Sequence, residues 1–260
     1  MTNQVANAEP SGSDWKSLYR VGGVAALIAG IIFRRNLAVE ISLFSTQKQP
    51  ATILDSFTLL QNNRLLGLTY LNIFDLVNYA LVGVMFLALY VLLRLANQSY
   101  MAIATTLGLV GIAVFSASNT ALSMLSLSDQ YAAATTEAQR TMLLAAGQAM
   151  LAINRFTSPG AHPGAGGYLS LLLIAVAGMI ISVVMLRSAV FSRATAYVGI
   201  LASAFDLAYC LAFAFLPAID GDLLAVYFIP AAGLCLMIWH ILIGRRLYQL
   251  GRLEGGARLE

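Results

Sequence analysis

Charged residues are scarce in this chain of 260 residues. Asp, Glu, Lys and Arg together make up 10% of it, whereas hydrophobic residues make up 59% and the mean hydropathy is +0.79. Soluble domains carry roughly a quarter charged residues, so this sequence lacks the polar groups that a water-facing surface requires. Several apolar stretches reach the roughly 20 residues that cross a bilayer as a helix. The composition therefore predicts an all-α, polytopic transmembrane helix bundle.

Cysteine and histidine are also scarce, with two residues of each. Cys210 and Cys235 both lie within apolar stretches, and zinc sites or disulfide frameworks need more ligands at closer spacing. His162 falls in a Gly- and Pro-rich loop, and His240 is too far from it in depth to share a metal ion. No phosphate-binding, dinucleotide-binding or hydrolase motif is present. We therefore expect no metal and no cofactor.

Six stretches are long and apolar enough to cross a membrane. They cover residues 20–44, 66–93, 101–125, 168–186, 196–216 and 223–243. We expect them to form one transmembrane domain over residues 18–250. A polar, disordered tail (1–17) precedes this domain and a short tail (251–260) follows it.

Basic residues are distributed unevenly between the two sides of this predicted bundle. With the N-terminus inside, the inner side collects Lys16, Arg20, Arg94, Arg187, Arg193, Arg245, Arg246, Arg252 and Arg258. The outer side collects Lys48, Arg64, Arg140 and Arg155, together with Arg34 and Arg35 if these lie outside. Positively charged segments stay in the cytoplasm, so we expect both termini and both tails there. Because most basic residues mark helix ends in this way, the net charge of +3 requires no nucleic-acid partner.

The stretch AQRTMLLAAGQAMLAINRF (138–156) is the one further candidate for a membrane span, which would be the seventh. Its uninterrupted apolar part, residues 141–153, is too short to cross a bilayer. A crossing here would also turn the arginines that follow it outward. We therefore expect an amphipathic helix on the outer face, and a second, weaker outer helix over residues 50–63.

The segment FRRNLAVE (33–40) places charged residues inside the first apolar stretch. In a continuous helix, Arg34 lies about 20 Å from the inner end, where a charge normally faces a cavity or a partner. Arg35 and Glu40 are five residues apart and do not meet on a helix. Their partners then come from other helices. Two alternatives are a break at Asn36, or a helix that ends at residue 33 and lets the arginines reach the headgroups.

Three other stretches carry polar side chains at helical spacing. These are Asn72, Asp75 and Tyr79, beside Asn78, in the second; Ser116, Asn119 and Ser123 in the third; and Ser203, Asp206 and Cys210 in the fifth. Two arginines and two aspartates balance in charge. We therefore predict a buried polar centre in the middle to outer half of the membrane, made of Arg34, Arg35, Glu40, Asp75, Asn78, Asn119 and Asp206. The alternative is an ion-pair network that only fixes the packing.

The phrases FDLVNY (74–79) and FDLAYC (205–210) are similar and fall in the second span of each half. Because the spans in question cross in opposite directions, the two halves, 18–130 and 165–250, could form an inverted-topology repeat with a site at their interface. A chance likeness over so short a phrase is the alternative.

The phrases GGVAALIAGIIFRRN and LLGLTYLNIFDLVNYALVG, within the six-span layout, resemble an uncharacterised bacterial membrane protein family, the domain of unknown function numbered four-three-eight-six. The resemblance covers essentially residues 18–250. It implies a protein of the bacterial cytoplasmic (inner) membrane, and it supplies no activity and no catalytic residues.

These observations favour binding or transport of a small polar or anionic solute, coupled to protons. Arg34 and Arg35 would hold an anionic group, Asp75 or Asp206 would carry the proton, and Asn78 and Asn119 would supply hydrogen bonds. The outer helix would act as a lid, and membrane lipids are the other expected partners. An intramembrane enzyme acting on a lipid or quinone, or a non-catalytic partner subunit, are the alternatives.

Overall fold

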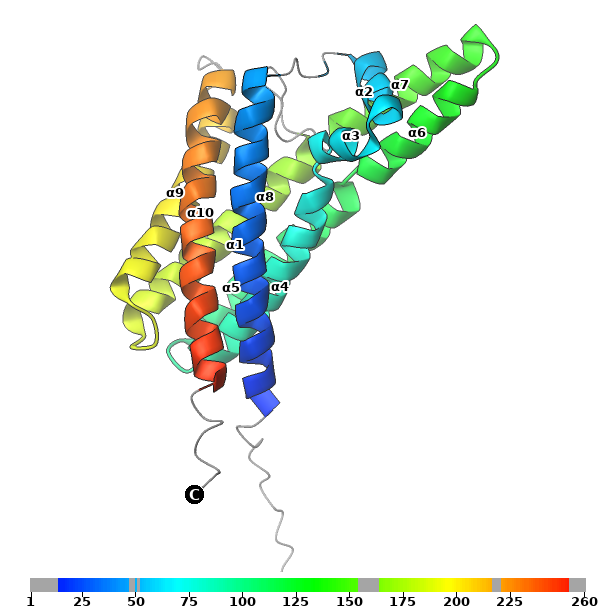
Figure 1. The fold of residues 1–260 in the computed structure, drawn as a ribbon. Coiled ribbons are helices and arrows are strands. Elements are labelled where there is room, and N and C mark those ends of the chain that lie inside the picture. Colours follow the sequence, from blue (N-terminus) through cyan, green and yellow to red (C-terminus); the bar gives the residue numbers. More distant parts are fainter. Residues whose placement is uncertain (1–13, 47–49, 51, 154–163, 217–220, 253–260) are drawn as a thin grey trace, which may run out of the picture.

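The computed structural model in Figure 1 describes residues 14–46, 50, 52–153, 164–216 and 221–252. Within these residues the chain is helical and contains no strand. The helices are α1 (Asp14–Thr46), α2 (Ile53–Asn62), α3 (Arg64–Tyr70), α4 (Ile73–Leu93), α5 (Gln98–Ser118), α6 (Ala121–Ala133), α7 (Glu137–Ile153), α8 (Ala165–Arg187), α9 (Arg193–Phe215) and α10 (Gly221–Arg252).

The six long helices form a closed ring. Each packs against two neighbours in the order α1, α4, α5, α8, α9 and α10, and α10 packs back along α1. In Figure 1, α1 and α10 stand side by side while α4, α5, α8 and α9 cross them at a tilt. The main apolar core lies between these helices and includes Phe86, Ile181 and Trp239. In the ring order, α4 therefore stands opposite α9.

Membrane-spanning helices are a clear feature of this ring. Among the described residues, five stretches are long and apolar enough to cross a bilayer: Trp15–Ile32, Ile73–Leu93, Gln98–Ala133, Ala165–Arg187 and Arg193–Phe215. The sixth member of the ring is α10, which packs between α1 and α9. The prediction of an all-α transmembrane bundle is confirmed.

Small residues allow the ring helices to approach closely. A Cβ atom added at Gly23 of α1 would lie 2.7 Å from the backbone nitrogen of Tyr248 in α10. One added at Gly111 of α5 would lie 2.8 Å from the side chain of Ile174 in α8. Close backbone approach of this kind maximises van der Waals contact where the hydrophobic effect does not drive helices together.

Two of the predicted spans are interrupted near the end that the topology prediction places outside, where continuous helices were expected. The second span divides at Asn72, whose backbone is left-handed (φ 59°) and separates α3 from α4. Asn tolerates this conformation better than most residues. The third span divides at Asn119, which is extended and separates α5 from α6. The predicted stripes through Asn72 and through Ser123 are therefore wrong, because these residues do not lie on the helices of their expected neighbours.

Four short helices form a cap at one end of the ring. α2, α3, α6 and α7 pack around a second apolar core that contains Ile53, Phe57, Leu60 and Met124. The Ser128 hydroxyl donates to the Phe57 carbonyl oxygen at 3.1 Å and thereby ties α6 to α2. The two predicted outer helices correspond to α7 and α2. Figure 1 shows α7 packed within this cap and not passing through the ring.

The first and last residues of the other predicted spans agree with the structure to within a few residues. The exceptions are α1, which starts earlier than predicted, and α10, which continues further. The start of α1 and the end of α10 lie together at the end of the ring opposite the cap, and the Arg20 side chain donates to the Gly251 carbonyl oxygen at 2.8 Å. Most of both predicted tails (1–13 and 253–260) and the loop containing His162 lie outside the described residues.

Candidate functional site

The charged segment of α1 is helical throughout. α1 continues without interruption from Asp14 to Thr46, so it neither breaks at Asn36 nor ends at Phe33. The side chains of Arg34, Arg35 and Glu40 lie outside the described residues. Their position is given by the backbone of α1 alone.

The packing of α1 on α4 fixes that position. Gly22 lies directly against Ala88, and Arg94 lies over the Trp15 ring nearer the start of α1, so the two helices run in opposite directions. The number of residues from Gly22 to Arg35 in α1 equals the number from Asp75 to Ala88 in α4. This separation corresponds to about 20 Å along each helix. Arg35 and Asp75 therefore both lie toward the same end of the ring, where α4 tilts away from α1 (Figure 1).

Asp206 is the most deeply buried described carboxylate of the predicted centre. It lies about 20 Å along α9 from the start of that helix, and 9% of its surface is exposed. Within the described part of the chain, no hydrogen bond or ion pair joins its carboxylate to another residue. An ionised carboxylate in such surroundings is costly unless a proton, a cation or hydrogen-bond donors compensate it.

Across the ring, α4 presents Tyr79 and Asn78 to this region. Tyr79 lies within electrostatic range of Asp75 on its own helix and of Asp206 on α9. The Tyr79 ring packs against Phe115 of α5 with centroids 4.5 Å apart. Asn78 is 1% exposed, and its side-chain oxygen has no hydrogen-bond partner among the described residues.

Two thiols lie within electrostatic range of the Asp206 carboxylate. They belong to Cys210, one turn further along α9, and to Cys235 of α10. Neither cysteine forms a disulfide. The described residues contain no group of three or more His, Cys, Asp or Glu that could hold a metal ion. The arrangement offers a carboxylate, a phenol and an amide in apolar surroundings, which suits hydrogen bonding and proton exchange.

Asn119 has a different environment from the one that the sequence analysis expected. Its amide nitrogen lies 3.3 Å from the Asn72 carbonyl oxygen, and its side-chain oxygen accepts a hydrogen bond from the Ala121 backbone at 3.1 Å. It therefore joins the two interruptions of the chain and accepts from the first backbone N–H of α6, whose N-cap is Thr120. The structure buries Asn78 and Asp206 and gives Asn119 this joining position, while a shared site of Asp75, Asn78 and Asp206 stays a prediction.

The structure contains a further buried polar cluster that the sequence did not predict. The Ser182 hydroxyl of α8 and the Trp239 indole nitrogen of α10 both point at Gly199 of α9, and neither has a hydrogen-bond partner among the described residues. Ser182 and Gly199 are single small residues in apolar helices, a pattern too common to single out. Trp239 lies in the main apolar core, where it is 2% exposed.

The chain belongs to the family described as Domain of unknown function (DUF4386), whose family model matches residues 17–244. No curated protein and no solved structure matches the chain. The family membership confirms the resemblance noted from the sequence, and it leaves the activity to be argued from the arrangement of the polar residues.

Proposed function

We propose that this protein binds and transports a small polar or anionic solute across the bacterial cytoplasmic membrane, with proton coupling through Asp206. The single observation that carries the proposal is the placement of Asp206. Its carboxylate lies deep within a transmembrane helix, almost fully buried, with no ion pair or hydrogen bond among the described residues. Ionisable groups at such depth usually serve transport or proton transfer.

The residues around Asp206 suit a solute site better than a purely structural network. A structural ion-pair network satisfies its members, because an unpaired buried charge or polar atom is costly. Here Asp206 and the Asn78 side-chain oxygen have no described hydrogen-bond partner. Groups that lack protein partners in a polar region are available to a solute.

Arg34 and Arg35 would supply the attraction for an anionic group. The antiparallel packing of α1 on α4 supports a position for their backbone toward the same end of the ring as Asp75. Protonation of Asp206 would remove its negative charge, so the positive charge of the two arginines would favour binding of an anion. Deprotonation of Asp206 would restore the negative charge and favour release of the anion. Proton and solute would thereby be coupled without any further cofactor.

The test is a ligand screen on purified protein. Thermal unfolding in detergent, followed by tryptophan fluorescence, is measured at pH 5 and pH 8 with inorganic anions, carboxylates, zwitterions and uncharged polar solutes. A ligand present at 100 times its Kd stabilises the folded state by about 2.7 kcal/mol. We expect at least one anionic or polar compound to raise the midpoint, with an effect that depends on pH. Uptake of that compound into proteoliposomes under a pH gradient then tests transport.

The matched variants are Asp206→Asn and Asp129→Asn. Both remove one carboxylate, but Asp129 lies exposed in the cap, where it pairs with Arg64 at 3.0 Å. We expect Asp206→Asn to remove the pH dependence of the ligand effect and the proton-driven uptake, and Asp129→Asn to retain both. The same pH-dependent response in Asp206→Asn and in the unmodified protein would rule out this role for Asp206.

A further inference from the structure

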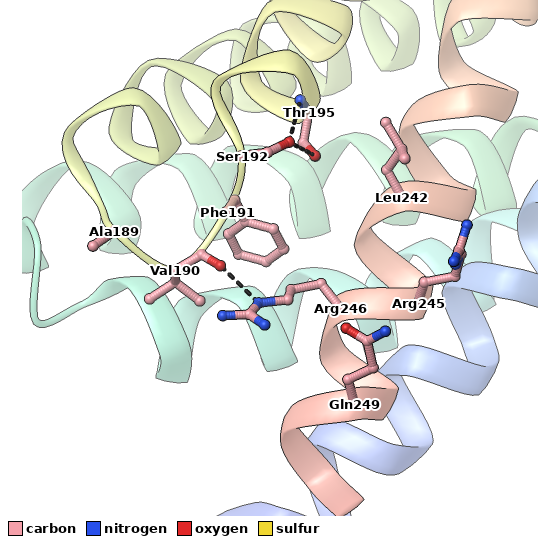
Figure 2. A pocket seen from close by; sticks show the side chains of 9 residues that line it. All are labelled: Ala189, Val190, Phe191, Ser192, Thr195, Leu242, Arg245, Arg246 and Gln249. Carbon is pink, nitrogen blue, oxygen red and sulfur yellow. Dashed lines mark hydrogen bonds between the residues drawn. The ribbon is translucent and has the colours of Figure 1, made fainter. Parts of the chain in front are cut away.

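A separate pocket lies at the end of the ring opposite the cap. Its volume is about 420 Å³, and Figure 2 shows its walls. The connection between α8 and α9 forms one wall, and the last turns of α10 form the other. The lining residues are Ala189, Val190, Phe191, Ser192, Thr195, Leu242, Arg245, Arg246 and Gln249. None of these residues belongs to the polar centre around Asp206.

The pocket carries positive charge without a negative counterpart. Arg245 and Arg246 both line it, and no acidic residue does. Neither arginine forms an ion pair with a described residue, and the same is true of Arg187 and Arg193 at the adjoining helix ends. This uncompensated charge indicates an anionic ligand.

The structure holds one of the two guanidinium groups in place. The Nε atom of Arg246 donates to the Val190 carbonyl oxygen at 2.8 Å, as drawn in Figure 2. This bond fixes the guanidinium against the α8–α9 connection and leaves its two terminal nitrogens for another partner. Arginine is well suited to phosphate because its planar donors match two oxygens at once.

The surface of α10 next to the pocket is apolar toward the centre of the membrane. Leu234, Ile238, Leu242, Arg245 and Gln249 follow one another at helical spacing and so form one stripe. Leu234 and Ile238 are 47% and 39% exposed. The stripe therefore changes from exposed apolar side chains to basic and polar ones at the membrane boundary. An amphiphilic anion matches both parts.

We propose that this pocket binds the phosphate group of an anionic phospholipid. Arg245 and Arg246 bind the phosphate oxygens, Gln249 donates to the headgroup, and an acyl chain lies along the apolar part of the α10 stripe. Basic pockets between transmembrane helices at the cytoplasmic boundary bind anionic headgroups in this manner. A soluble phosphate compound would use the same arginines without the apolar stripe.

The test measures lipid binding to the purified full-length protein by native mass spectrometry. Phosphatidylglycerol and phosphatidylcholine with identical acyl chains are titrated in the same detergent. We expect phosphatidylglycerol to bind more tightly. Each basic side chain at such a surface contributes about five-fold in affinity, so Arg245→Gln should weaken phosphatidylglycerol binding about five-fold and the Arg245→Gln/Arg246→Gln double variant about 25-fold.

The control is Arg94→Gln, which removes the same charge at the same end of the ring. Arg94 ends α4, opposite α9, and stacks over Trp15. We expect this variant to bind both lipids as the unmodified protein does. Because Arg246 also holds the α8–α9 connection, the single Arg245→Gln variant decides the outcome if the double variant does not fold.

Three results would overturn the proposal. One is equal binding of the two lipids, and another is unchanged phosphatidylglycerol binding in Arg245→Gln. The third is full displacement of phosphatidylglycerol by millimolar inorganic phosphate, which would make a soluble phosphate compound the ligand. Persistence of lipid binding in phosphate buffer supports the lipid as the source.

Discussion

Replacing Gly23 by alanine should separate α1 from α10 and destabilise the ring. The new Cβ atom would lie 2.7 Å from the Tyr248 backbone nitrogen, 3.0 Å from the Gly244 carbonyl oxygen and 3.1 Å from the Tyr248 Cα atom. Favourable contacts need about 3.5–4.0 Å, and all three neighbours are backbone atoms that no rotamer change can move. The two helices must therefore move apart by an amount on the order of 1 Å.

The magnitude follows from a comparison with Gly233→Ala. A Cβ atom at Gly233, also in α10, would meet nothing within 4 Å. Both variants gain up to about 1 kcal/mol from the higher helix propensity of alanine, so this contribution cancels in their difference. Overpacking costs about 1–3 kcal/mol. We therefore expect Gly23→Ala to be less stable than Gly233→Ala by about that amount.

The assay is unfolding in mixed micelles by increasing SDS, followed by far-ultraviolet circular dichroism. Gly244→Ala should be destabilised in the same way, because its Cβ atom would lie 2.9 Å from the Gly23 carbonyl oxygen. The double variant should lose less than the sum of the two single losses, since one separation of the helices relieves both clashes. Equal stability of Gly23→Ala and Gly233→Ala would refute the close approach of α1 and α10.

Two further predictions concern the outer end and the topology. Asn119→Ala should destabilise the protein by about 1–2 kcal/mol in the same SDS assay, because it removes the hydrogen bond from the Ala121 backbone and the one to the Asn72 carbonyl oxygen. Ser123→Ala, an exposed change nearby, should have little effect. Single cysteines at Thr136 and Gln249, introduced after Cys210 and Cys235 are replaced by alanine, should react with an impermeant maleimide from opposite sides of the membrane. Labelling of both positions in intact cells would contradict the topology.

The transmembrane architecture could be predicted from the sequence because length and apolarity determine which stretches cross a bilayer. The basic residues at the ends of these stretches also predicted which helix ends lie together at one end of the ring, as they do in the structure. The breaks at Asn72 and Asn119 could not be predicted in this way. Both lie in sequences that remain apolar through the break, so hydropathy carries no signal there, and each depends on hydrogen bonds between residues distant in sequence.

The candidate site could be predicted only in part. Helical spacing predicted that Asp206 and Asn78 face other helices, and both are buried. Spacing does not say which helices meet, so the position of α4 opposite α9 came only from the packing. The pocket beside Arg245 and Arg246 was also missed. In the sequence these arginines resembled orientation signals, and the Val190 carbonyl that fixes Arg246 carries no side-chain signature.

The order of helices in the ring bears on the relation between the two halves. A two-fold relation that exchanges α1 with α8, α4 with α9 and α5 with α10 maps every neighbouring pair of the ring onto another neighbouring pair. The similar phrases around Asp75 and Asp206 do not follow that relation. Asp75 lies in the first turn of α4, whereas Asp206 lies near the middle of α9. Asp75 and Asp206 therefore occupy different positions along their helices, and the inverted repeat stays a prediction. A closed ring of six helices in chain order satisfies the relation whatever its origin, and the polar centre is an asymmetric feature within it.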